Sequence, residues 1–232
     1  MQIGCDIDSA RWTARVVLEH PALLGGVAIH PNDAPRHANG THASGLNYEE
    51  AFAEIASLAR LDRIRVVGET GLDYFRTPPE GRGAQTRSFR DHIALAKETG
   101  RVLQIHDRDA HADVIAILER DGAPDRTVFH CFSGDAAMAR LCAERGWYVS
   151  VAGTVTFGNA TALREAIAAV PLSLLLVETD APFLAPQPHR GSPNAPYLIP
   201  HTMRAIAALA GVGLSEACDA ISRTSEEVYG PW

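Results

Sequence analysis

The chain has 232 residues, of which 46% are hydrophobic and 21% charged, so it has the composition of an ordinary globular protein and the length of one (β/α) barrel. Its formal net charge of −7 disfavours a protein that coats duplex nucleic acid with its whole surface, although a local site that holds one phosphate through metal ions is compatible with it. The four cysteines form no CxxC pair, which argues against a disulfide framework or a zinc ribbon and suits a reducing compartment. Because there is no apolar stretch near 18 residues and no signal-like N-terminus, we expect a cytoplasmic protein without a membrane span.

Short apolar runs recur along the chain, and each ends in a polar or metal-ligating residue. The N-terminal MQIGCD is typical of the end of a strand, and six clearer runs follow it. Runs of this length and composition are typical of buried parallel strands, which are apolar on both faces. The six runs end at His30 (GGVAIHP), Glu69 (IRVVGETGLD), His106 (RVLQIHDRD), His130 (RTVFHCFSG), Gly153–Thr154 (WYVSVAGT) and Asp180 (LLLVETDAP).

Segments with helical periodicity lie between these runs. Asn47 is placed to cap a helix over residues 48–61, and Gly100 to end one over 85–99. The same pattern predicts helices over residues 112–120, 135–145, 159–169, 200–211 and 215–228. Two longer intervals, residues 35–47 and 75–83, are expected to be surface loops over the active face. A strand, a helix and two loops need roughly 25 to 40 residues, so each interval fits one βα unit.

This alternation predicts an α/β protein of the TIM-type (β/α)8 class, formed by a single domain over residues 1–232. Only seven strands can be counted, and the class needs eight. We therefore expect the first strand and helix to be missing, so that the domain is incomplete at its N-terminus.

The strand ends carry a set of metal ligands. In a barrel of this class the carboxyl ends of the strands face one mouth, and imidazole and carboxylate together suit a divalent metal such as Mg, Mn or Zn. Glu69 can bridge two metals, His106 and His130 can complete the shell of one, and Asp180 can serve the other. Each residue alone has a plainer alternative, because a single histidine at a strand end is often structural and an acid there can cap the next helix. Their recurrence at successive strand ends favours a site with two metals that activates water for attack on phosphorus.

Several nearby residues can support such chemistry. Asp73 can orient a ligand or form a turn, and Arg108 and Arg190 can each bind a phosphate or form a surface ion pair. His30 can donate a proton to a leaving oxygen or simply bond a backbone carbonyl. The pair Tyr74–Phe75 can stack a base or anchor a loop.

At these residues the chain resembles the TatD family of metal-dependent deoxyribonucleases, which are amidohydrolase-like metal hydrolases. The matching stretches are AIHPND, VVGETGLDYFR, QIHDRDAHAD, FHCFSGD, LLVETDAPFLAP and HRGSPNAPYLIP, in the family's order. The resemblance implies that Glu69 bridges the metals, that His106 and His130 bind one metal and that Asp180 binds the other. It also implies that His30 contacts the substrate phosphate or takes part in catalysis, and that Arg190 and Asn194 belong to a loop on the substrate side.

One departure from the family is clear, because the sequence contains no HxH pair, the motif that ends the first strand in many members. We expect a start site placed about 30 to 40 residues too late, by the length of one βα unit, or a truncated protein.

The function predicted from the sequence is hydrolysis of DNA phosphodiester bonds, at single strands or strand ends, with Glu69, Asp180 and His30 as catalytic residues and Arg108, Arg190, Asn194 and His30 as substrate contacts. Two alternatives stay open. One is a metal-dependent ester or amide hydrolase, such as an aminoacyl-tRNA deacylase. The other is a catalytically impaired barrel that acts as a binding protein.

Overall fold

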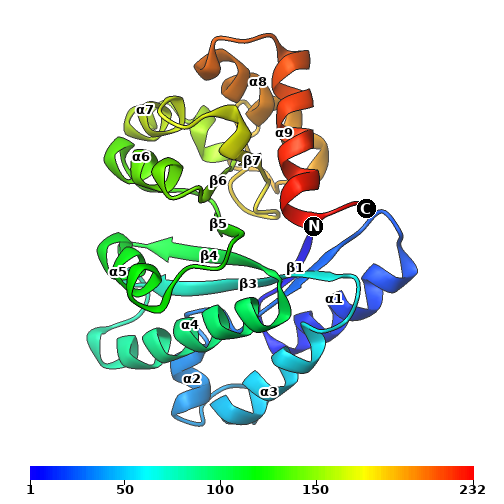
Figure 1. The fold of residues 1–232 in the computed structure, drawn as a ribbon, viewed down its shortest axis with the longest axis vertical. Helices are drawn as coiled ribbons and strands as arrows, with labels where there is room; N and C mark the ends of the chain where they lie inside the picture. The colour runs from blue at the N-terminus through cyan, green and yellow to red at the C-terminus, as the bar shows by residue number, and fades with distance from the viewer. The chain divides into compact units, whose positions relative to one another are not determined.

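The computed structural model describes all 232 residues, and the chain divides into two compact units. The first unit contains residues 1–128 and 229–232, and the second contains residues 129–228. Figure 1 shows the helices and strands of each unit along the chain. The division falls within one short strand, β5 (Thr127–Phe129).

The strands of the first unit are parallel and follow one another in sequence order: β1 (Gln2–Gly4), β2 (Gly25–Val27), β3 (Ile64–Asp73) and β4 (Val102–Arg108). Most of their residues are buried, as expected for strands covered on both faces. β3 and β4 are the long strands of this unit (Figure 1). They carry the predicted ligands Glu69 and His106.

The helices of the first unit begin and end at the signals that the sequence contains. They are α1 (Ile7–Glu19), α2 (Ala34–Ala38), α3 (Tyr48–Leu58), α4 (Pro79–Thr99) and α5 (His111–Asp121). The predicted cap at Asn47 is confirmed, because its side chain accepts a hydrogen bond from the Glu50 N–H at 2.9 Å. Gly100 ends α4 in the left-handed conformation, also as predicted. α4 packs on β3, which leaves its other face outward (Figure 1).

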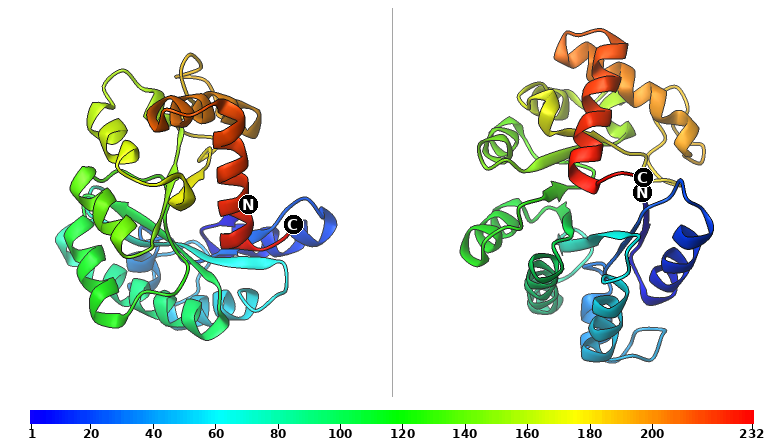
Figure 2. Two further views of the ribbon diagram at one scale, coloured as in Figure 1. Left: turned by 45° about the horizontal axis from the view of Figure 1, so that its top comes forward. Right: turned by 45° about the vertical axis from the view of Figure 1, so that its right-hand side comes forward.

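The second unit contains the parallel pair β6 (Tyr148–Val151) and β7 (Leu175–Val177). Its helices are α6 (Ala136–Glu144), α7 (Thr161–Ala168), α8 (Ile199–Ala210) and α9 (Leu214–Tyr229). Short 3-10 turns lie at Gly153–Thr156, Leu172–Leu174 and Pro196–Leu198. The closing helices α8 and α9 are the orange and red helices of Figure 2.

Seven parallel strands in sequence order, each followed by a helix or a helical turn, form the topology of a TIM-type (β/α) barrel. The predicted fold class and the count of seven strands are therefore confirmed. The single domain that lacks its first strand and helix stays a prediction.

Both predicted loops are wrong in part, since α2 occupies the first residues of one and α4 the last residues of the other. Residues 79–83 belong to α4 rather than to a loop over residues 75–83, because Pro79 occupies the first helical position, where its missing N–H costs nothing. Within 35–47, α2 ends at Ala38 and the chain then runs in turns to Asn47. No single helix is long and apolar enough to cross a membrane, and residues 196–210 and 214–229 pass that test only as a pair bent by 104°.

Candidate metal centre

Glu69 reaches the site through an irregularity in β3. Val67 pairs with Leu103 and Thr70 with Ile105, so β3 uses one more residue than β4 between these two pairs. An extra residue of this kind is a β-bulge, which locally turns the strand and re-aims its side chains. The bulge contains Gly68 and Glu69, and Glu69 is left only 9% exposed.

Gly71 allows β4 to approach β3 just beyond the bulge. Its φ is +137°, and a Cβ built there would lie 2.1 Å from the backbone oxygen of His106. Only a residue without a side chain fits this position. Gly71 is therefore the residue that allows the strands carrying Glu69 and His106 to approach each other.

His30 follows β2, and its backbone is held on both sides. The His30 N–H donates to the Cys5 carbonyl at 2.9 Å, and the preceding Ile29 N–H donates to Nε2 of His92 at 3.1 Å. His92 is fully buried in α4 and its Nδ1 donates to the Ser88 carbonyl at 2.7 Å, so Nε2 is the acceptor. Burial lowers the pKa of His92 to about 4, which keeps the ring neutral. Sequence reasoning missed His92, which its helical pattern does not distinguish from a core residue.

These elements bring together a carboxylate and two imidazoles. Glu69 Oε2 lies 2.8 Å from His106 Nδ1 and 3.5 Å from His30 Nε2. One donor atom from each of the three residues lies within 4.8 Å of the other two. Glu69 Oε1 faces the Cys5 thiol, with Sγ at 3.9 Å. The side chains of His30, Glu69 and His106 are only 17%, 11% and 18% exposed, so the cluster is sheltered but accessible.

Asp73 holds the other end of the His106 ring. Its Oδ2 lies 3.2 Å from His106 Nε2 and accepts from the Asn32 amide at 3.1 Å, while Oδ1 accepts from the Arg76 N–H at 2.8 Å. Burial alone would raise the pKa of this carboxyl, but the bonds from His106, Arg76 and Asn32 more than offset it and hold the pKa well below its usual range. The two roles considered for Asp73 are both present, since it closes a turn and orients a candidate ligand.

The tautomer of His30 follows from its neighbours. The Asn32 N–H donates to His30 Nδ1 at 3.1 Å, so Nδ1 is an acceptor and the ring proton of the neutral imidazole resides on Nε2. That N–H faces Glu69. The geometry fits a proton donor better than a metal ligand, because a ligand would need its lone pair on Nε2.

The chemistry of the cluster fits a divalent metal. Glu69 offers two oxygens and His106 an imidazole nitrogen, and the second nitrogen of His106 is held by the buried carboxylate of Asp73. A carboxylate that orients a ligating histidine through its far nitrogen is a recurrent feature of metal sites. The donor set therefore suits a metal that accepts both nitrogen and oxygen.

A second cluster lies within the second unit, around His130. Its Nδ1 lies 2.5 Å from Glu178 Oε2, and its Nε2 lies 3.7 Å from Asp180 Oδ1. Glu178 also accepts from the Cys131 N–H at 2.6 Å. Burial alone would raise the pKa of Glu178, but His130, the Ser150 hydroxyl and the Cys131 N–H lower it. Sequence reasoning missed Glu178, although it follows β7 directly in the same ETD stretch as Asp180.

The three other predicted substrate contacts differ in how far their polar atoms are already engaged. Asn194 is 5% exposed, its amide donates to the carbonyls of Thr179 and Phe183 at 2.7 Å each, and its oxygen accepts from the Ala195 N–H. It thus fastens the loop that carries Asp180. The guanidinium groups of Arg108 and Arg190 form no ion pair and lie over aromatic rings instead, 3.9 Å from the Phe75 centroid and 4.5 Å from the Phe157 centroid.

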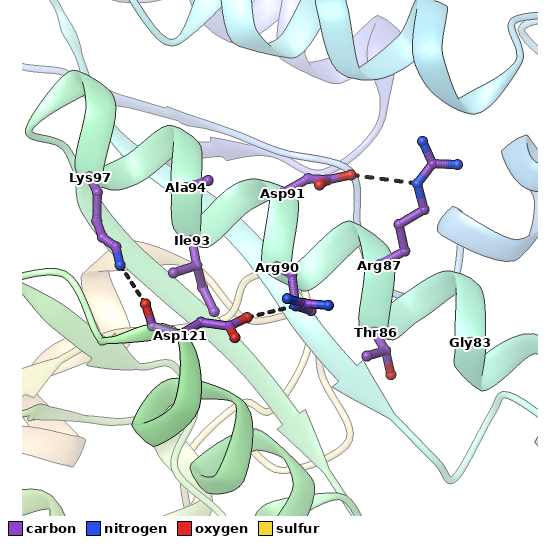
Figure 3. A pocket seen from close by; sticks show the side chains of 9 residues that line it. All are labelled: Gly83, Thr86, Arg87, Arg90, Asp91, Ile93, Ala94, Lys97 and Asp121. Atoms are coloured by element: carbon purple, nitrogen blue, oxygen red, sulfur yellow. Dashed lines mark hydrogen bonds and ion pairs between the residues drawn. The ribbon is translucent and has the colours of Figure 1, made fainter.

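A concavity of about 850 Å³ on the outer side of α4 has a different character (Figure 3). Its cations are already engaged: Arg90 pairs with Asp121 at 2.7 Å, Lys97 donates to the Asp121 carbonyl at 2.6 Å and Arg87 faces Asp91 at 3.8 Å. None of the candidate ligands lines it.

Known proteins with similar sequences are metal-dependent hydrolases by name. The sequence matches the family described as TatD related DNase over residues 1–230. It is 42% identical over 232 residues to a Mycobacterium tuberculosis protein named an uncharacterized metal-dependent hydrolase, TatD, covering 98% of this chain and 84% of the relative. It is 41% identical over 178 residues to the Escherichia coli K12 metal-dependent hydrolase YcfH, covering 76% and 67%.

Solved structures share the fold. The Escherichia coli protein YJJV, a TatD homologue, superposes with a TM-score of 0.87 at 22% identity, covering 99% of this chain and 85% of that one. A TatD family hydrolase from Entamoeba histolytica gives 0.83 at 17% identity, covering 99% and 84%. With a family match over residues 1–230 and the ligand cluster at the ends of its strands, the chain belongs to the TatD family.

Proposed function

We propose that this protein is a metal-dependent hydrolase that cleaves phosphodiester bonds in DNA, at single strands or strand ends. The observation that carries the proposal is the arrangement of Glu69, His106 and Asp73, with the Nε2–H of His30 beside them. The family name and the names of the relatives support a metal-dependent hydrolase, and the choice of DNA rests on the family name and on the phosphate-binding residues.

Glu69 and Nδ1 of His106 would hold a metal in the first unit, and His130 and Asp180 of the second unit remain predicted ligands. When bound, a divalent metal supplies a Lewis acid that withdraws electron density from a phosphoryl oxygen. With a metal held by Nδ1, the His106 proton would lie on Nε2, where the Asp73 carboxylate is placed to accept it.

His30 holds a proton at Nε2 because its Nδ1 is occupied by the Asn32 N–H. An alkoxide that leaves phosphorus carries developing negative charge, and the Nε2–H of His30, whose side chain is 17% exposed, can donate a hydrogen bond to it. The guanidinium of Arg108, which no carboxylate neutralises, can offset the charge of the phosphate.

The test compares three substrates with the metal-loaded protein: single-stranded DNA, bis(p-nitrophenyl) phosphate and an aminoacyl ester. We expect cleavage of the two phosphodiesters and none of the ester. Glu69→Gln should lower turnover by at least about 100-fold, in the range found when a preorganised charge is removed from a catalytic site. It should also lower the bound metal measured by elemental analysis. Glu98→Gln, which changes an exposed carboxylate paired with Arg60, is the matched control and should change neither quantity.

Two results would contradict the proposal. Cleavage of the ester with inert phosphodiesters would favour the ester or amide hydrolase. Well below one metal per chain after reconstitution, with all substrates inert, would favour a binding protein. His130→Ala tests the predicted ligand of the second unit and should lower the metal content. Because it also removes the imidazole that faces the Glu178 carboxylate, the Tm of the metal-free protein should fall as well.

A further inference from the structure

An exposed aromatic ring lies next to the candidate metal centre, at the point where β3 and β4 end. Phe75 is 62% exposed, so most of this large apolar side chain is accessible to solvent. The guanidinium of Arg108 covers one of its faces, with Cζ 3.9 Å from the ring centroid. With one face covered and most of the ring still accessible, the other face is open to solvent.

The strand register ties this pair to the candidate ligands. Asp73 and Arg108 are partners in the β3–β4 pairing, and the Tyr74 N–H donates to the Arg108 carbonyl at 2.9 Å. Arg108 lies two residues beyond His106 on β4, and such residues point to the same face of a strand. Two residues correspond to about 6.6 Å along a strand, so the pair lies roughly one nucleotide away from the ligands.

The turn that presents Phe75 is fixed from both sides. Asp73 accepts from the Arg76 N–H at 2.8 Å, and the Tyr74 hydroxyl donates to Asp113 at 2.6 Å. The guanidinium of Arg82 covers the Tyr74 ring at 4.0 Å, and burial followed by the bond to Asp113 raises the pKa of Tyr74 to about 12. Tyr74 is thus fully engaged as an anchor, and of the two aromatic residues only Phe75 is free to receive a ligand.

The charge of Arg108 points to the nature of that ligand. Arg108 forms no ion pair, although the chain carries a net charge of −7 and other arginines, such as Arg11, Arg60 and Arg90, pair with carboxylates. A flat ring backed by an unpaired guanidinium combines a stacking surface for a base with a positive charge for its phosphate, the combination by which proteins hold single strands. A duplex would not offer an unstacked base to such a surface.

We propose that Phe75 and Arg108 form a platform that stacks one unpaired nucleobase of a single DNA strand next to the phosphate held at the candidate metal centre. This inference rests on the proposed function and specifies its substrate, a strand with at least one splayed base. Phe75 supplies the stacking face, and Arg108 stiffens the ring and contributes charge.

The experiment measures binding separately from cleavage. Fluorescence anisotropy is recorded with metal-free protein in EDTA, using a labelled ten-residue oligothymidine and an abasic oligonucleotide of equal length. A stacked base contributes about 1 to 3 kcal/mol, so Phe75→Ala should weaken oligothymidine binding by about 5- to 150-fold and leave the abasic strand within about twofold. Phe75→Trp should restore binding, and Phe75→Leu, which keeps apolar bulk beneath Arg108, should not.

Two controls complete the design. Trp12→Ala removes another exposed aromatic ring, on α1, and should change neither affinity. Arg108→Ala should weaken both oligonucleotides and reduce the slope of log Kd against log salt by about 0.7, the value for one phosphate contact on a single strand.

Equal loss on both oligonucleotides in Phe75→Ala, no loss on either, or no measurable binding by the unaltered protein would each overturn the platform. Failure of the proposed function is read separately, as failure of the metal-loaded protein to hydrolyse bis(p-nitrophenyl) phosphate, which has no base to stack.

Discussion

Replacing Asp73 by asparagine is the sharpest test of how the candidate metal centre is organised. The substitution keeps the shape of the side chain and changes only one oxygen to an NH2 group. In the protein Oδ1 accepts from the Arg76 N–H, and Oδ2 accepts from both the Asn32 amide and His106 Nε2. An asparagine that keeps its oxygen toward the Arg76 N–H points its NH2 group at the Asn32 amide and at His106 Nε2, which both act as donors toward Asp73.

The conflict can be relieved at His106 only if the ring moves its proton from Nε2 to Nδ1. Nδ1 is the atom that faces Glu69 at 2.8 Å and would serve as the ligand, so the exchange removes the lone pair that a metal needs. Loss of an orienting partner of this kind typically lowers metal affinity by about 10- to 100-fold, which is about 1.4 to 2.7 kcal/mol. We therefore expect the Kd for Zn²⁺ or Mn²⁺ to rise by that factor in Asp73→Asn.

The assay is a competition titration with a chromogenic chelator, accompanied by the Tm of the metal-free protein. Asp91→Asn is the control. Asp91 also accepts a hydrogen bond, from the Tyr48 hydroxyl at 2.8 Å, but it contacts none of the candidate ligands. It should leave the metal Kd within about twofold. A metal Kd in Asp73→Asn equal to that of the unaltered protein, in a folded variant, would refute the argument from the tautomer.

Two further predictions concern the scaffold. Gly71→Ala should destabilise the protein by roughly 3 kcal/mol, because the new Cβ would meet the His106 carbonyl at a residue with positive φ. Gly83→Ala is the control and should be neutral or slightly stabilising, because its Cβ meets no neighbour. Equal urea midpoints for the two variants would be incompatible with the close approach of β4 to Gly71. Burial lowers the pKa of His92 to about 4 from its ordinary value of 6.5, so between these pH values the unfolded chain binds a proton that the folded chain does not. The stability that this group contributes is therefore complete above about pH 6.5 and falls as the pH drops toward 4, by up to about 3 kcal/mol. His92→Leu should flatten this part of the urea midpoint curve between pH 7 and 5, and an unchanged slope would show that His92 is not the titrating group.

The positions of the strands, and the gathering of three candidate site residues, could be predicted because they follow from local patterns. An apolar run that stops at a histidine or an acid defines a strand end, and parallel strands bring such ends to one edge. His30, Glu69 and His106 are accordingly found within 4.8 Å of one another. The placement of His130 and Asp180 in the same metal centre stays a prediction.

Other parts of the site depend on register, which the sequence does not display. The contact between Asp73 and His106 exists because the bulge at Gly68–Glu69 shifts β3 by one residue against β4. Without the bulge the side chains beyond it would point to the opposite face. His92 escaped prediction for a related reason, since it contacts the site region through a tertiary hydrogen bond and does not break the helical pattern of α4. Glu178 does end an apolar run, but only its contact with His130 distinguishes it from Asp180 in the same stretch.

The stretch GETGLD supplies two carboxylates that contact the same imidazole ring. Glu69 contacts one nitrogen of His106 and Asp73 contacts the other, so two carboxylates of one strand grip opposite ends of the same ring. Gly71 lies between them on the strand and lets the backbone of β4 approach, because a Cβ there would strike the His106 backbone. The carboxylates differ in surroundings, because Asp73 is 1% exposed with three hydrogen-bond partners, whereas Glu69 faces the accessible side with His30 and Cys5. The buried carboxylate holds the ring, and the accessible one is the better placed of the two for the cation that we propose, because the two acids reach opposite ends of the ring.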